Sequence, residues 1–175
     1  MLYMVELDFT APTRQSAWDA WYGEHLRILL AVPGIHTAQR FVCTTRHSAP
    51  YLAVYTVEAP EVFESGPYRA RGGRDSTGEW KVTMVNWDRN LFSGIDRAPA
   101  VAEDEILLVT ESAQAAAAQP EIAFAWLDAV GLDRTVARRA IAVAAASRAH
   151  DVRLAGDGRI RAYRTLMSQR TAGSA

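Results

Sequence analysis

Lysine is almost absent from this chain of 175 residues, in which Lys81 is the only lysine among 19 basic residues. The others are arginines, which indicates a GC-rich coding bias first and recognition of carboxylates or phosphates second. Cysteine is equally scarce: Cys43 stands alone, which excludes an internal disulfide and a zinc site built on cysteines. The net charge of −1 gives the chain no general attraction to nucleic acid or to an anionic membrane.

Long hydrophobic runs and several well-known motifs are also missing. No apolar stretch reaches the roughly 18 residues of a membrane span, and the N-terminus begins without a leader-like segment. We find no glycine-rich phosphate loop, dinucleotide fingerprint, Gly-x-Ser-x-Gly elbow or aromatic RNA-binding motif. The sequence therefore predicts a cytoplasmic globular protein that binds neither nucleic acid nor membrane and uses no organic cofactor.

The composition changes near residue 97, in both alanine and aromatic residues. Of 31 alanines, 22 lie in residues 98–175, whereas 13 of the 16 aromatic residues lie before that point. The segment 96–104 has small residues, one proline and charged ends, and is typical of a linker. We therefore expect a first domain over 1–95, which carries any pocket, and a degenerate second copy of it over 105–175.

Hydrophobic alternation and turn residues order the elements of the first domain. Residues 2–9 alternate as in a strand, with Glu6 and Asp8 on the face opposite the apolar one. A helix that begins near Pro12 should end at Pro33-Gly34. The pattern then predicts two strands, a short helix and a last strand, over 36–44, 51–57, 59–68 and 79–90. The order β-α-β-β-α-β is the ferredoxin-like arrangement of α+β proteins.

The second domain repeats part of this order. We expect a strand over 105–110, a helix over 120–130, and strands over 136–146 and 159–166, although the alanines of 136–146 also suit a helix. The similarity of 51–57 to 159–166 is the clearest sign of a repeat. A second helix and a fourth strand are missing from this pattern unless the C-terminal tail supplies them.

A longer stretch of the first domain is similar to a known group of proteins. Residues 18–35 contain an aromatic pair, Trp21-Tyr22, then His25, a hydrophobic run and Pro33-Gly34. With the strand at 51–57 and the segment 87–92 (WDRNLF), this resembles the dimeric α/β-barrel superfamily of ferredoxin-like domains, and within it the EthD-like and related small proteins. The resemblance covers about residues 1–95.

The resemblance implies a fold more clearly than a function. Two such domains pair their sheets into a barrel, usually across a homodimer; a tandem chain could also do this internally, and the sequence leaves both open. Glu6 and Asp8 should then face away from the first helix. Relatives include polyketide cyclases, dehydratases, isomerases, monooxygenases, haem-binding enzymes and proteins with no known activity.

His25 is the first candidate for chemistry. Positions 18, 22, 25, 29 and 32 follow one helical face, so His25 lies in an apolar stripe with Trp18 and Tyr22. It is either a core histidine bonded to a backbone carbonyl, or a general acid or base in a pocket between helix and sheet. An ordinary histidine pKa of about 6.5 permits proton transfer near neutral pH without a cofactor, and burial would lower it.

Aromatic residues could complete such a pocket. Tyr22 lies one turn before His25 and is predicted to be its catalytic partner. Substrate-binding roles are predicted for Trp18 and for hydroxyl donors to a carbonyl or enolate oxygen: Tyr3, Tyr51 and Tyr55. Plain packing is the alternative for each of them.

Arginines and carboxylates supply further candidates. Three arginines surround Gly72-Gly73 in the loop 69–74, where Arg71 could bind an acidic substrate or the loop could simply be solvated. Glu6 and Asp8 could be catalytic or could bond across the barrel, one of them with Arg40. Trp80 and Trp87 should point to opposite faces of the last strand.

Metal binding is disfavoured. Three of the histidines lie eleven residues apart, a spacing that matches no local ligand motif: His25, His36 and His47. No metal is therefore predicted, and haem binding through His25 and nucleophilic catalysis by Cys43 are lesser alternatives.

These observations lead to three functional hypotheses. The first is a cofactor-independent lyase, dehydratase, isomerase or cyclase that acts on a small aromatic or carbonyl-containing metabolite by His-mediated proton transfer. The second is a non-catalytic EthD-like accessory or small-molecule-binding protein, and the third is a cofactor-free monooxygenase.

Overall fold

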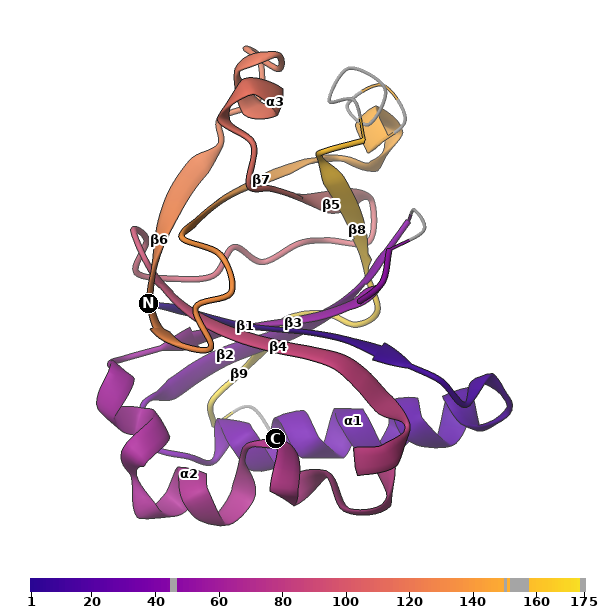
Figure 1. Cartoon of the computed structure of the whole chain (residues 1–175), viewed down its shortest axis with the longest axis vertical. Coiled ribbons are helices and arrows are strands. Elements are labelled where there is room, and N and C mark those ends of the chain that lie inside the picture. The colour runs from indigo at the N-terminus through magenta and orange to yellow at the C-terminus, as the bar shows by residue number, and fades with distance from the viewer. Residues whose placement is uncertain (45–46, 150, 152–157, 174–175) are drawn as a thin grey trace.

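Eight antiparallel strands close into a barrel within the single chain (Figure 1). The computed structural model describes residues 1–44, 47–149, 151 and 158–173. Around the barrel the strands follow the order β3-β1-β4-β6-β7-β5-β8-β2, and β2 pairs back to β3. The first half supplies β1 (Leu2–Phe9), β2 (Ile35–Cys43), β3 (Tyr51–Val57) and β4 (Met84–Ser93); the second supplies β5 (Glu105–Thr110), β6 (Ala125–Leu132), β7 (Arg138–Ala145) and β8 (Arg161–Thr165). A ninth short strand, β9 (Arg170–Thr171), extends the sheet beside β2. A second chain is not needed to complete the barrel.

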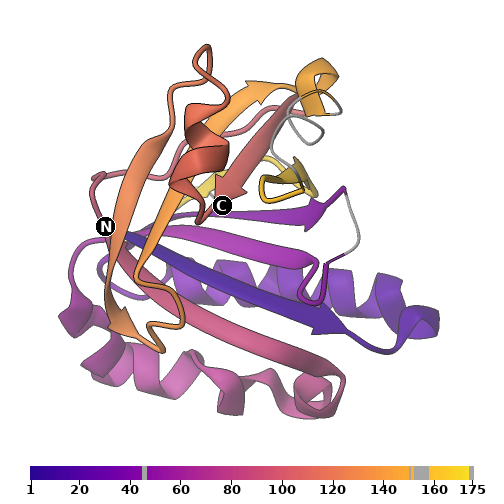
Figure 2. The same ribbon diagram turned by 45° about the horizontal axis from the view of Figure 1, so that its top comes forward.

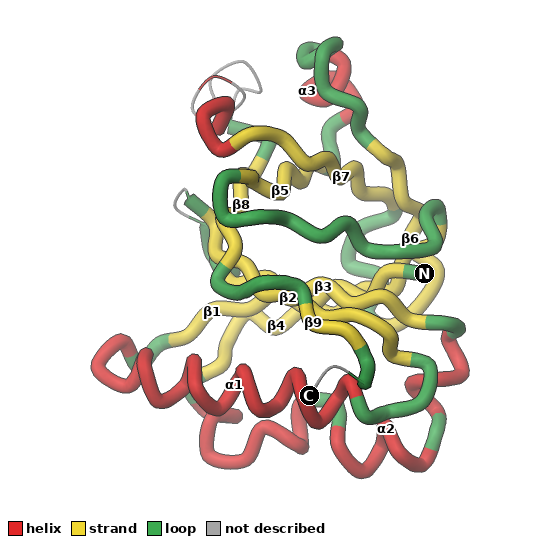
Figure 3. The backbone as a smooth tube through the Cα atoms, turned by 180° about the vertical axis from the view of Figure 1, so that it is seen from behind, coloured by secondary structure: helices red, strands yellow, loops and turns green. Residues whose placement is uncertain are grey.

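Helices cover the outer face of the first half. Helix α1 (Gln15–Leu30) and the shorter α2 (Gly66–Arg71) lie against the outer face of β1–β4, as Figures 1 and 3 show from two sides. The 3-10 helices η1 (Pro12–Arg14), η2 (Pro60–Glu64) and η3 (Arg74–Val82) connect the elements of this half. The second half contributes the short helices α3 (Ala113–Ala117) and η4 (Ala146–Arg148). None of the described helices combines the length and apolar character that crossing a membrane requires.

The two halves enclose one interior (Figure 2). Strand β1 divides its side chains as its alternation predicts: Tyr3 packs beneath α1, whereas Leu2 and Met4 pack inside the barrel. The barrel core joins residues of both halves, including Phe92 of β4 and Tyr163 of β8. Since both faces of β1 are covered, nearly all of this strand is buried.

The turn that follows α1 lies at Gly34, as the sequence predicts. Gly34 has a φ of +89°, a left-handed conformation that glycine adopts without steric cost. A Cβ at this position would lie 2.5 Å from a Cγ2 atom of Val62. The turn from α1 into β2 therefore requires glycine both for its backbone angle and for space.

The last strand of the first half lies further along the chain than the predicted range 79–90. Residues 74–82 form η3, and the strand covers Met84–Ser93. Gly78, with a φ of 56° and a ψ of −129°, breaks any extended run here. Trp80 is thus not on a strand, and both Trp80 and Trp87 pack on the helix-covered side instead of on opposite faces.

The predicted helix over 120–130 is wrong. Residues 125–132 form β6, which pairs with both β4 and β7 and so links the two halves. The helix of this region is α3, which begins after Ser112, whose side chain accepts a hydrogen bond from the Ala115 amide. Long-range pairing outweighs the local helical preference of these residues.

The remaining strands of the second half also need one correction. The segment 136–146 contains the strand β7, as predicted, but β8 in 159–166 takes the fourth position and not the third. The strand missing from the sequence pattern is therefore β6, in place of the predicted helix, and not a strand of the tail. The order β6-β7-β5-β8 matches β2-β3-β1-β4 position by position, so β7, not β8, corresponds to β3.

Replacing Gly34 by alanine should cost more stability than the same change at Gly73. Both glycines have positive φ, but a Cβ at Gly73 meets nothing within 4 Å. We expect each variant to lose about 1–3 kcal/mol for its backbone strain. Gly34→Ala should lose about 1–3 kcal/mol more by overpacking against Val62. Urea unfolding of both variants measures the difference, and equal losses would refute the steric account.

Candidate functional site

Helix α1 and the sheet beneath it bring most of the predicted site residues together. Those buried in this layer are Tyr3, Trp18, Tyr22, His25 and Tyr55. Tyr51 is partly buried at its edge, where its hydroxyl donates to Gln15 Oε1 at 3.0 Å. Arg71 is exposed at the end of α2 and stands apart from them.

His25 lies in an aromatic environment. Its ring stacks on Trp21 with centroids 5.0 Å apart and an interplanar angle of 13°, and it meets the Tyr22 ring edge-on. Burial lowers the pKa of His25 to about 4, so the imidazole is neutral at pH 7. Within the described part of the chain, no hydrogen bond holds the ring.

Four tyrosines form a buried cluster next to this histidine. The hydroxyls of Tyr3 and Tyr68 are 3.4 Å apart, and the Tyr3 and Tyr55 rings stack with centroids separated by 5.2 Å. Burial raises the pKa of Tyr3, Tyr22, Tyr55 and Tyr68. These phenols are therefore protonated at neutral pH and act as hydrogen-bond donors.

A pocket of about 470 Å³ opens beside this cluster, and we call it the Tyr68 pocket. It has aromatic walls, three arginines and two carboxylates: Phe63, Tyr68, Trp87, Arg69, Arg74, Arg89, Asp75 and Asp133, with Gly72 and Gly73. Asp133 holds the Arg89 guanidinium at 3.1 Å. Apart from Asp133, every lining residue comes from the first half of the chain. His25 and Arg71 do not line this pocket, although Arg69 and Arg74 of the same arginine-rich loop do.

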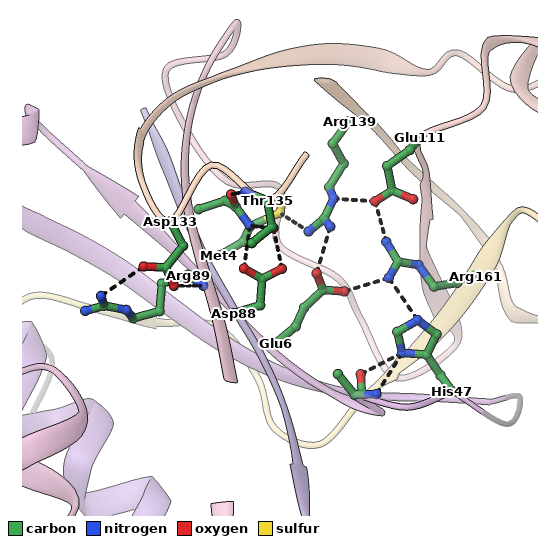
Figure 4. A network of polar contacts seen from close by, with 12 residues as sticks. Met4, Glu6, His47, Asp88, Arg89, Glu111, Asp133, Thr135, Arg139 and Arg161 are labelled. Atoms are coloured by element: carbon green, nitrogen blue, oxygen red, sulfur yellow. Dashed lines mark hydrogen bonds and ion pairs between the residues drawn. The ribbon is translucent and has the colours of Figure 1, made fainter. Parts of the chain in front are cut away.

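A second polar region lies inside the barrel (Figure 4). Glu6 is 4% exposed, and its two carboxylate oxygens meet two arginines of the second half: Arg139 at 2.7 Å and Arg161 at 2.8 Å. The same arginines contact Glu111 at 2.8 and 2.6 Å. Burial alone would raise the pKa of Glu6, but the charges of Arg139 and Arg161 outweigh it and lower the pKa. Glu6 is therefore an ionised carboxylate.

Comparisons with known proteins can now be set beside this geometry. No protein-family model and no curated protein sequence matches the chain. Among solved structures, an anthrone oxidase-like protein is similar over 99% of this chain and 94% of its own, with a TM-score of 0.52 and 12% identity. A "putative monooxygenase" from Lactobacillus acidophilus NCFM is similar over 98% of this chain and 96% of its own, with a TM-score of 0.52 and 10% identity.

The chain shares their fold. At 10–12% identity the similarity concerns the fold alone, a mixed α+β barrel with few helices. It extends over nearly the whole chain, so it includes the second half, for which the residues predict only a degenerate copy.

The sequence did not identify the partners of the buried carboxylate. The predicted partner Arg40 instead pairs with Asp19 at 3.0 Å and lies over the Tyr22 ring, on the helix side. Glu6 does face the barrel interior, as predicted. Arg139 and Arg161 were missed because inward-facing arginines on alternating strands look like a solvated face. The available signal was the buried apolar residues next to them: Ala140 and Ile141 after Arg139, and Ile160 and Ala162 on either side of Arg161.

Tyr68 was also missed as a functional residue, since it was assigned only to the end of a short helix. No group of three histidine, cysteine, aspartate or glutamate residues in the described part of the chain is arranged to hold a metal ion. His36 is exposed on β2, whereas the His47 ring contacts Arg161 inside the barrel.

His25 should make the protein less stable in mild acid. Its pKa is lowered from about 6.5 in the unfolded chain to about 4 in the folded protein, so the unfolded chain binds the proton first. Stability contributed by the neutral ring is complete above about pH 6.5 and declines as the pH falls toward 4, by about 3 kcal/mol in all.

Replacing His25 by glutamine should remove this dependence. Urea unfolding across that pH range measures the slope for the wild type and His25→Gln. His36→Gln, at an exposed position, is the matched control and should keep the wild-type slope. An unchanged slope in His25→Gln would show that other groups cause the acid sensitivity.

Proposed function

We propose that the Tyr68 pocket binds a small aromatic or carbonyl-containing compound and promotes proton transfer in it. The observation that carries this proposal is a neutral phenol, Tyr68, placed beside Arg89 in a pocket with the aromatic walls Phe63 and Trp87. An aromatic compound packs well between such walls. The three arginines favour a ligand on which negative charge is present or develops.

The chemistry follows from these two groups. A substrate carbonyl oxygen would accept a hydrogen bond from the Tyr68 hydroxyl, which lies 3.4 Å from the Tyr3 hydroxyl. Loss of a proton from the neighbouring carbon places negative charge on that oxygen, where Tyr68 and the Arg89 charge stabilise it. Lyases, dehydratases, isomerases and cyclases all use such a step, and it requires no organic cofactor.

His25 stays the base predicted from the sequence; because it does not line the Tyr68 pocket, it would act only on a compound that reaches beneath α1 from this pocket. The neutral His25 ring has a nitrogen lone pair that can accept a proton at pH 7, and the Tyr22 ring lies edge-on to it. Trp18, Tyr51 and Tyr55 are proposed to shape the binding layer, and Arg71 to attract an acidic substrate. Asp133, a carboxylate of the pocket itself, is the alternative base.

We also propose membership in the dimeric α/β-barrel superfamily of ferredoxin-like domains, near the EthD-like proteins. The β-α-β-β-α-β order of the first half supports this, as does the matching strand order of the second half, which we interpret as its degenerate copy. Homodimer formation stays a prediction.

An oxygen-consuming reaction is the second candidate, and the names of the two similar structures favour it. Removal of a proton from the CH2 group of an anthrone yields an electron-rich anion. This anion can reduce O2, so that anthrone and O2 give a quinone and water. Turnover of an anthrone in air but not under argon would support this reaction, whereas binding without turnover in either case would favour an accessory protein.

Tyr68→Phe should slow turnover strongly. Removing one donor to a developing oxyanion typically lowers kcat by about 10²–10³. Tyr163→Phe is the matched control, because it also removes a buried tyrosine hydroxyl, but one that contacts Glu6 inside the barrel and outside the pocket. Anthrone turnover and quenching of tryptophan fluorescence measure activity and binding separately. Full activity in Tyr68→Phe would contradict the assignment of this pocket.

His25→Ala should lower kcat by about 10²–10⁴ if His25 is the base. The wild-type rate should then fall only as the pH approaches about 4, because the ring must be neutral to accept a proton. A thermal melt of the same sample separates lost chemistry from lost folding. Wild-type kcat in a folded His25→Ala variant would assign the proton to another base, and Asp133→Asn is then the next test.

A further inference from the structure

Two carboxylates share one pair of arginines inside the barrel, and they do so unequally. Glu6, the inner carboxylate, uses both oxygens: Oε2 meets Arg139, while Oε1 accepts from Arg161 and from the Tyr163 hydroxyl. Each Glu6 oxygen thus meets a guanidinium, and Glu6 fixes both guanidiniums from one side (Figure 4).

Glu111, the outer carboxylate, is held by one oxygen only. Arg139 Nε and Arg161 Nη2 both donate to its Oε1, at 2.8 and 2.6 Å. No donor among the described residues reaches Oε2. The Glu111 side chain is 35% exposed, whereas those of Arg139 and Arg161 are 2% and 12% exposed.

Open space adjoins the outer carboxylate. Glu111 and Arg161 line two neighbouring pockets of about 510 and 500 Å³, and Arg139 lines the second. Both pockets also include His47, whose Nε2 lies 3.2 Å from Arg161 Nη1. Arginine can only donate, so in this contact the His47 nitrogen is the acceptor.

We propose that the Arg139–Arg161 pair is a binding site for a small carboxylate ligand, and that Glu111 is an internal occupant which the ligand displaces. Guanidinium groups bind carboxylates in a directed geometry, and here they are pre-positioned by Glu6 in a largely buried site. The four charges balance at present. Exchange of one carboxylate for another preserves this balance, whereas a neutral ligand would leave one arginine charge uncompensated.

The site is independent of the Tyr68 pocket. The two sets of lining residues share no member, and the carboxylate site draws its arginines from β7 and β8 of the second half. It is therefore not an extension of the proposed catalytic pocket.

Glu111→Gln tests the displacement directly, with benzoate as the carboxylate and benzamide as its neutral counterpart. Wild-type protein should bind benzoate weakly. Glu111→Gln should bind it at least about tenfold more tightly, because the competing charge is gone. Benzamide should show no such gain. Isothermal titration measures the affinities, and benzoate should raise the melting temperature of Glu111→Gln more than that of the wild type.

Glu121→Gln is the matched control. Glu121 also pairs with an arginine, Arg148, but on the surface and outside both pockets, so this variant should bind benzoate as the wild type does. Arg161→Lys added to Glu111→Gln should remove the gain, since lysine lacks the planar fork. Tyr68→Phe added to Glu111→Gln should keep it, which separates this site from the proposed function.

Three results would overturn the proposal: a wild type that binds no benzoate, a folded Glu111→Gln with wild-type affinity, or the same gain in Glu121→Gln. If Glu111→Gln does not fold, Glu111→Asp replaces it. Its shorter carboxylate should still loosen the contact with both arginines and give a smaller gain in affinity, and no gain there would also overturn the proposal.

Discussion

Glu6 is an ionised carboxylate inside the barrel, and both arginines that neutralise it come from the other half of the chain. A buried charge is tolerated only when it is paired, and loss of one partner typically costs about 3–5 kcal/mol. Arg139 lies on β7 and Arg161 on β8, so the pairing is complete only when the second half has folded against β1. Closure of the barrel and neutralisation of Glu6 therefore depend on the same contact between the two halves.

The two faces of the first sheet, β1–β4, differ in their chemistry. The interior face carries ion pairs and the shared apolar core. The outer face carries Tyr3 and Tyr55 and is covered by α1 with His25, and burial keeps these three side chains neutral at pH 7. Neutral donors of this kind stabilise charge that appears only during a reaction, and in the proposed site the fixed charge of Arg89 adds to them. The interior, with its permanent charges, suits binding of a ligand that is already an anion.

The local sequence was sufficient to predict the features that depend on residues close together in the chain. The alternation of β1, the glycine after α1 and the aromatic layer beneath it all follow from periodicity and turn chemistry. The strand β6 could not be predicted, because Ala125–Leu132 becomes extended through pairing with β4 and β7. Arg139 and Arg161 were missed for the same reason: their partner Glu6 is more than 130 residues earlier, and one sequence does not reveal such a contact. Tyr68 became a candidate only in the structure, where its hydroxyl lies beside that of Tyr3 on β1.

Strand β4 lies between the Tyr68 pocket and the barrel interior. Its neighbouring residues Asp88 and Arg89 line different pockets, Asp88 the barrel interior and Arg89 the Tyr68 pocket (Figure 4). Asp88 accepts a hydrogen bond from Thr135 at 2.6 Å, and Arg89 is held by Asp133, so both contacts anchor β4 to the same short connection between β6 and β7. Alternation along one strand therefore places two adjacent residues in two different pockets. Because the second half supplies Asp133 to the pocket and both arginines to the interior, each site depends on the contact between the two halves, although the two sites share no lining residue.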